Sequence, residues 1–223
     1  MGDSQLSIAV LAFEDLSPEK DQEHFCDGIA EEIINNLAQM SDIRVAARTS
    51  AFAYKNKPED IRNIGKHLNV QTILEGSVRK AENRLRIAAQ LIDVADGCHL
   101  WSEQFDREIS NIFEIQVEIA RNISRTLKIQ LSDKEKLAIK KVPTENIEAY
   151  DFYLRGRQFF YRHKRQFMLH AIDMFSRAIE QDAGYAHAYS GRADCHSYSY
   201  YFFGGSHADV KQEAKDNETA LKL

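Results

Sequence analysis

The chain has 223 residues, of which 43% are hydrophobic and 28% charged, a composition that is typical of folded globular proteins and excludes disorder of the whole chain. Its 29 Lys and Arg residues against 34 Asp and Glu residues give a net charge of -5, so no broad positive field attracts nucleic acid or anionic lipid. The three cysteines form no C-x-x-C pair and indicate neither a disulfide framework nor a zinc ribbon, and no apolar run reaches the roughly 18 residues of a membrane span.

The first part of the chain predicts strands alternating with helices. Residues 7–13, SIAVLAF, are continuously apolar and predict a strand that is buried on both faces. Apolar residues then recur every four positions over residues 21–40, which predicts an amphipathic helix. Residues 43–47 predict a second strand, followed by a loop. The next helix is expected to begin at Pro58 and to end at a left-handed Asn69.

Two further strands and a long helix complete this pattern. Residues 72–97 predict two alternating strands joined by a polar turn at residues 81–84, and on the second strand one face is apolar. That face consists of Leu85, Ile87, Ala89 and Leu91. A helix over residues 112–131 follows, and Asn111 and Glu114 have the spacing of a capping box. The order of elements predicts an α/β domain over residues 1–131.

The remainder of the chain changes character. Residues 132–146 are charged, poor in aromatic side chains and interrupted by Pro143, which predicts a linker. Residues 147–223 predict helices only, in two pairs of similar size, so the sequence contains an internal repeat. The chain starts just before a strand-like run and stops inside a helical pattern, and we therefore expect it to be a fragment of a larger protein.

The stretch DGCHLWSEQFDRE, residues 96–108, holds a thiol, an imidazole and several carboxylates. Alternation along a strand would place Cys98 and His99 on opposite faces, where His99 is badly oriented to accept a proton from Cys98. His99 and Glu103 would share a face, but two ligands do not close a metal site. The favoured interpretation is structural: Trp101 and Phe105 pack on the core, and the charged groups cap the following helix or pair with Arg107.

A basic segment, RGRQFFYRHKR, covers residues 155–165. Arginines interleaved with aromatic rings are found where proteins hold single-stranded nucleic acid. Successive residues of a helix diverge by about 100°, however, so Phe159, Phe160 and Tyr161 cannot form one stacking platform. Packing of these rings between helices is favoured, and an anionic partner on Arg155, Arg157 and Arg162 remains the alternative. The phosphate-loop and zincin motifs are absent from the sequence, which predicts no catalytic residue, cofactor or metal.

Residues 144–223 resemble tetratricopeptide repeats. Gly156 occupies the small-residue position of a first helix, and Ala171, Phe175 and Ala178 follow the small-aromatic-small spacing of a second helix. Ala183 stands where proline is typical, and the loops between helices are longer than usual. The resemblance implies a concave face that binds a protein or peptide. The residues implied to line this face are Tyr153, Arg157, Phe160, Ser190, Asp194 and Ser197.

Residues 1–131 resemble the TolB amino-terminal-like domain that precedes tetratricopeptide repeats in bacterial signalling proteins. The resemblance is carried by AVLAFEDLSPEKDQEHFCDGIAEEI, VAARTSAFAYK, DIRNIGKHLNV, ILEGSVRKAENRLRIAAQLID and LWSEQFDRE. Departures are Ala12 in place of proline, Asn69 in place of glycine and Cys98 in place of an aromatic residue.

The two resemblances together imply a non-catalytic regulatory or sensory part of a larger protein. The output domain of such proteins is an adenylate or guanylate cyclase or a winged-helix DNA-binding domain, and of these the cyclase is favoured. A small-ligand site in the α/β domain is a further alternative. Nucleic-acid or membrane contact within this chain is not expected. The side of the membrane on which the chain works, if its parent is anchored there, is left open.

Overall fold

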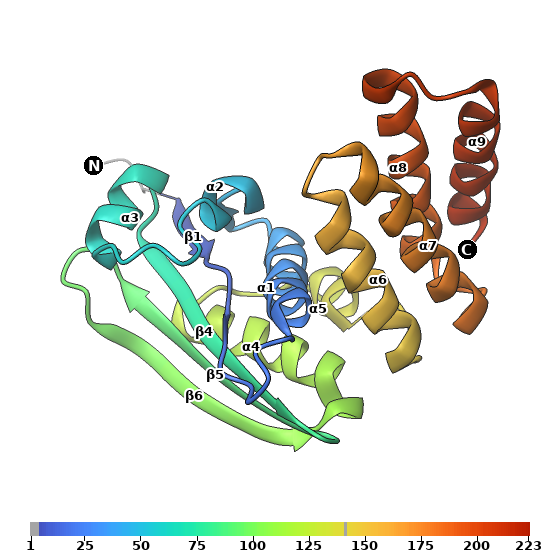
Figure 1. The fold of residues 1–223 in the computed structure, drawn as a ribbon. Coiled ribbons are helices and arrows are strands. Elements are labelled where there is room, and N and C mark those ends of the chain that lie inside the picture. The colour runs from blue at the N-terminus through green and yellow to red at the C-terminus, as the bar shows by residue number, and fades with distance from the viewer. Residues whose placement is uncertain (1–4, 141) are drawn as a thin grey trace. The chain divides into compact units, whose positions relative to one another are not determined.

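The computed structural model describes residues 5–140 and 142–223. The chain divides into two compact units, Met1–Lys141 and Val142–Leu223. The first unit holds a mixed sheet with helices, and the second consists of helices (Figure 1). The protein therefore combines an amino-terminal α/β part with a carboxy-terminal helical part.

The sheet of the first unit has the order β3-β1-β4-β5-β6, and β2 pairs with β4 outside this path. Its strands are β1 Leu6–Val10, β2 Glu14–Asp15, β3 Ile43–Val45, β4 Thr72–Ala81, β5 Arg84–Asp93 and β6 His99–Glu108. The pairs β1 with β3, β1 with β4 and β2 with β4 are parallel, whereas β4 with β5 and β5 with β6 are antiparallel. The three long strands form a meander that extends well beyond β1 (Figure 1).

Helices cover both faces of the sheet to different extents. They are α1 Glu23–Ala38, α2 Arg48–Phe52, α3 Ile61–Leu68, η1 Ile109–Asn111, α4 Ile112–Thr126 and α5 Asp133–Lys140. The side chains of Leu85, Ile87, Ala89 and Leu91 are fully buried on the face that carries α1 and α4, as their alternation predicts. On the other face, Ile64 of α3 packs with Ala9 and Ile73. The outer parts of β5 and β6 on that face carry exposed polar residues.

Several expected boundaries in this unit are wrong. The first strand ends at Val10, and the expected loop after β3 contains the short helix α2. The helix expected to begin at Pro58 begins at Ile61, because the Asp60 side chain accepts a hydrogen bond from the Arg62 backbone N–H at 2.9 Å and caps it there. Asn69 does adopt the left-handed conformation, with φ of 52°.

The long helix also departs from expectation at both ends. It ends at Thr126 rather than Leu131, since Lys128 takes a left-handed φ of 56° and leaves the helical path. The Asn111 side chain donates to the Glu114 carboxylate at 3.3 Å instead of accepting from a backbone N–H, so the expected capping box does not form. The segment expected as a linker contains α5, where Glu135 accepts hydrogen bonds from both Ser132 and Ser41.

The second unit consists of consecutive helices that pack each against the next. They are α6 Ile147–Phe160, α7 Arg165–Gln181, α8 Ala186–Phe203 and α9 His207–Lys222. Two of them carry well-formed N-caps: Asn146 accepts from Glu148 and Ala149 before α6, and Ser206 forms a capping box with Asp209 before α9. Since α6 also contacts α8 directly, these two helices share one face of the unit.

Candidate functional site: the face shared by α6 and α8

The ring of Phe175 in α7 fixes the spacing of α6 and α8. It is fully buried, and Gly156 of α6 and Gly191 of α8 both lie directly against it. Any side chain at either glycine would collide with this ring. Helices approach one another closely where such small residues occur, and the two glycines therefore bring α6 and α8 together.

Arg157 of α6 and Asp194 of α8 lie near enough for the charge of Arg157 to act on the Asp194 carboxyl. The Arg157 guanidinium lies 4.8 Å from the centre of the Tyr161 ring and donates to the Tyr161 hydroxyl. Partial burial raises the pKa of the Asp194 carboxyl above its ordinary value, and the positive charge of Arg157 counteracts this effect. Asp194 as a whole residue is nevertheless exposed. The two helices thus bring a half-buried cation and an exposed carboxylate within electrostatic range of each other.

Aromatic side chains continue the same face toward the carboxyl ends of α6 and α8. The ring centres of Phe160 and Tyr198 are 6.0 Å apart, and those of His163 and Tyr198 are 5.1 Å apart. Tyr198 also lies 4.5 Å from Phe202, whose side chain is 68% exposed. Partly exposed aromatic rings near an arginine are typical of the residues that dominate protein interfaces.

The residues implied to line the concave face differ in accessibility. Tyr153 is only 7% exposed, because its ring packs against Phe175 and Tyr185 at centre distances of 5.7 and 5.1 Å. Arg157, Phe160 and Ser197 are half-buried, whereas Ser190 and Asp194 are exposed. The sequence reasoning missed His163, Tyr198 and Phe202. The run YSYYFF was the available signal, but the sequence did not show which of its rings face α6.

The basic segment 155–165 does not present a single surface. Arg155 pairs with Asp151 at 2.7 Å, and the Arg162 guanidinium lies 4.8 Å from the centre of the Phe167 ring. Phe159 stacks on Phe167 at 6.0 Å, while Phe160 faces α8. The consecutive rings therefore contact different neighbours.

The stretch DGCHLWSEQFDRE forms a tight turn and then β6. The Asp96 carboxylate accepts from the Cys98 backbone N–H at 2.8 Å, and its charge raises the pKa of the exposed Cys98 thiol. A raised pKa makes a thiol a poorer nucleophile at neutral pH. Phe105 is 1% exposed and tilts against Trp101, and Glu103 accepts from Asn122 of α4 at 2.8 Å. The contacts of Phe105 and Glu103 hold β6 against the core and against α4.

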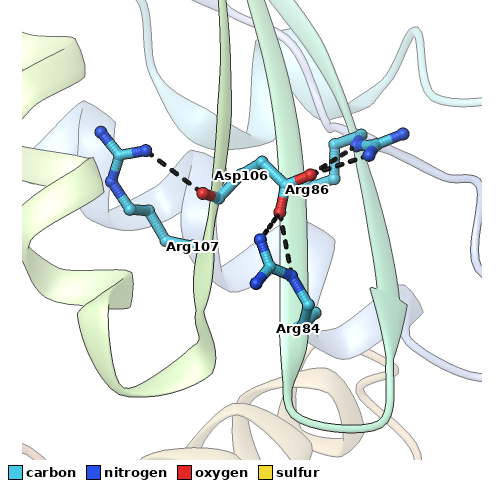
Figure 2. Close-up of polar contacts among 4 residues, drawn as sticks. All are labelled: Arg84, Arg86, Asp106 and Arg107. Carbon is cyan, nitrogen blue, oxygen red and sulfur yellow. Dashed lines mark hydrogen bonds and ion pairs between the residues drawn. The ribbon is translucent and has the colours of Figure 1, made fainter.

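The charged partners in this stretch differ from those expected. Figure 2 shows that the Asp106 carboxylate holds both Arg86 and Arg84 of β5, with the closest Arg86 contact at 2.7 Å. These two arginines lower the pKa of Asp106. Arg107 donates to the backbone carbonyl of Asp106, at 3.2 Å, and pairs with no carboxylate of the described residues. The expectation that carboxylates here pair with Arg107 is therefore wrong, because the antiparallel register places Arg86 directly opposite Asp106.

The remaining thiols are enclosed. Cys26 and Cys195 are both fully buried, and burial raises the pKa of each. Within residues 5–140 and 142–223, no cluster of three or more His, Cys, Asp or Glu side chains is arranged to hold a metal ion. In the same residues, no helix combines the length and apolar character needed to cross a membrane.

The chain matches no model of a known protein family. It is 42% identical over 184 residues to a protein of Rhizobium meliloti (strain 1021) named "Putative adenylate cyclase 3". That match covers 82% of this chain but only 31% of the relative, so the chain corresponds to less than a third of the relative's length.

Parts of the chain are also similar to solved structures. TolB from Acinetobacter baumannii matches 59% of this chain and 30% of its own, with 15% identity and a TM-score of 0.44. The carboxy-terminal domain of LpoB from Salmonella enterica matches 47% of this chain and 84% of its own, with 14% identity and a TM-score of 0.39. At this level of similarity no function transfers.

Proposed function

We propose that this chain is a non-catalytic regulatory part of a larger bacterial nucleotide cyclase, and that its helices α6 to α9 act as tetratricopeptide pairs that bind a protein or peptide. The observation that carries the proposal is the 42% identity to a protein named as an adenylate cyclase, of which this chain covers only 31%. The same relative favours a cyclase over a winged-helix domain as the output domain.

The binding role rests on the face that α6 and α8 share. Arg157 and Asp194 offer both signs of charge there, next to the Phe160 and Tyr198 rings. A protein segment could pair with these charges and cover the aromatic rings at once, and such central Arg and Tyr residues contribute most to binding energy.

The catalytic half of the proposal is tested with the chain alone and with the Rhizobium meliloti relative. We expect the isolated chain to form no cyclic nucleotide from ATP or GTP with Mg²⁺ or Mn²⁺. Deleting the corresponding segment from the Rhizobium meliloti relative should change how its cyclase activity responds to growth conditions while leaving turnover measurable. Cyclic nucleotide production by the isolated chain would contradict the proposal.

The binding half is tested by crosslinking in cells and identification of the captured protein. Arg157→Ala and Asp194→Ala should each reduce recovery of that protein by roughly tenfold, as for residues at the centre of an interface. The matched controls are Arg177→Ala and Asp173→Ala, which remove an exposed ion pair within α7. Equal recovery with all four variants would show that binding uses another surface.

A further inference from the structure

A cleft of about 660 Å³ lies in the first unit, away from the face that α1 and α4 cover. Its floor includes Glu75 and Ser77 of β4 and Ala88 and Gln90 of β5, which point away from the buried side chains of the same strands. One wall is the chain segment of residues 11–16, and the other is the loop between α2 and α3. The volume is within the range of small-molecule sites.

Both walls are fastened to the rest of the unit. In the α2–α3 loop, the Lys55 ammonium contacts Asp27 at 2.7 Å and Glu23 at 2.7 Å, two carboxylates of α1. The opposite wall is tied to β4, because the Leu11 N–H donates to the Leu74 carbonyl at 2.9 Å and the Leu16 N–H to the Val78 carbonyl at 2.8 Å. The cleft therefore has a defined shape before any ligand arrives.

Three charged residues that line the cleft, Lys57, Glu75 and Glu14, form no ion pair with any described residue. Lys55 is already balanced by its two carboxylates, whereas the Lys57 ammonium lies 5.9 Å from the centre of the Tyr54 ring. Across residues 5–140 and 142–223, no carboxylate forms an ion pair with Lys57, and no cation forms one with the half-buried Glu75 or with the exposed Glu14 of β2. Glu75 lies directly opposite Gln90 in the β4–β5 register, so a carboxylate and an amide adjoin on the floor.

We propose that this cleft binds a small zwitterion, an amino acid or a short peptide. Its ammonium group would pair with Glu75 and hydrogen-bond to the Gln90 amide, and its carboxylate would pair with Lys57. Apolar parts of the ligand would contact Leu11, Phe13 and Pro58, which also line the cleft. A dicarboxylate would meet Glu75 and Glu14 with the same sign of charge, and a diamine would leave the Lys57 ammonium without a counter-charge, so both are disfavoured.

The experiment screens the whole chain against the common L-amino acids and their alanyl dipeptides, with succinate and putrescine as comparators. Unfolding is followed by the fluorescence of Trp101, the single tryptophan, which lies in β6 of the same unit. At about 100 times its dissociation constant, a bound zwitterion should raise the midpoint by about 5 °C. Titration calorimetry with the same compound then gives its affinity.

Variants locate the site. Glu75→Gln and Lys57→Gln should each weaken binding about tenfold or more, because each removes one charge-assisted contact. Ala88→Leu should abolish binding by filling the floor of the cleft. The matched controls Glu82→Gln, in the β4–β5 turn, and Lys66→Gln, on α3, lie outside the lining and should bind normally.

The proposal is overturned if no zwitterion raises the midpoint, or if succinate or putrescine does so equally. It is also overturned if binding is unchanged in Glu75→Gln, Lys57→Gln and Ala88→Leu. None of these outcomes depends on the cyclase or on partner binding by α6 and α8, so the two proposals fail separately.

Discussion

Phe175 packs so closely against Gly156 that a Cβ atom on the glycine would lie 2.7 Å from the Phe175 ring. Gly191 meets the same ring from α8, where a Cβ would lie 2.6 Å away. One side chain thus sets the distance between three helices. The contact explains why a residue with low helix propensity is found inside both α6 and α8.

Gly156→Ala should therefore destabilise the helical unit. Overpacking costs about 1–3 kcal/mol and outweighs the roughly 1 kcal/mol that alanine gains in a helix. Urea denaturation followed by circular dichroism measures the change in the free energy of unfolding. Phe175→Leu in the same chain should recover part of the loss by making room for the methyl group. Gly184→Ala, outside the helices, is the control and should have a small effect.

The buried ion pair of the helical unit makes a second prediction. Asp216 is 1% exposed and accepts from Arg192 at 2.8 Å and from Gln212 at 2.9 Å. Asp216→Ala leaves a largely buried guanidinium without its partner and should lower the free energy of unfolding by about 3–5 kcal/mol. Asp173→Ala, which breaks an exposed pair with Arg177, should change it by less than about 0.5 kcal/mol. Equal losses of stability in Asp216→Ala and Asp173→Ala would show that the pair of Asp216 with Arg192 is not a buried stabilising contact.

A third prediction concerns acid stability of the first unit. Hydrogen bonds from Ser132 and Ser41 lower the pKa of Glu135 from 4.5 to about 2. The pKa of Glu135 is lower in the folded chain than in the unfolded chain. The hydrogen bonds to its carboxylate therefore stabilise the fold fully above about pH 4.5. This stabilisation is lost as the pH falls toward 2. Carboxyl titration by NMR should report the low value, and Glu135→Gln should make unfolding less dependent on pH in this range. A measured pKa of Glu135 near the ordinary 4.5 would show that the hydrogen bonds from Ser132 and Ser41 do not form.

The fourth prediction uses the cysteines as reporters. Cys98 is exposed, whereas Cys26 and Cys195 are buried. Iodoacetamide should modify Cys98 alone in the folded protein, and slowly at neutral pH, because Asp96 raises the pKa of the Cys98 thiol. Asp96→Asn should accelerate the modification, since it removes the negative charge while the amide oxygen still accepts from the backbone. Mass spectrometry of the intact chain measures both rates. Equal labelling of all three thiols would contradict the described burial.

Local sequence patterns predicted those features that depend on neighbouring residues. The left-handed Asn69, the turn between β4 and β5 and the buried face of β5 all follow from local conformational preference and alternation. Local patterns were less reliable where one side chain can form either of two contacts. Asn111 had the right spacing to cap α4, yet its side chain reaches Glu114 instead.

The sequence by itself determined the order and type of most elements, because apolar periodicity and turn residues act over only a few positions. Alternation within DGCHLWSEQFDRE also predicted that Phe105 packs on the core. The tertiary structure decided which distant groups come together: Arg157 comes near Asp194, Phe175 packs against two glycines, and Glu75 and Lys57 line one cleft. Such meetings depend on register and helix packing across residues far apart in the chain, and no local pattern encodes them.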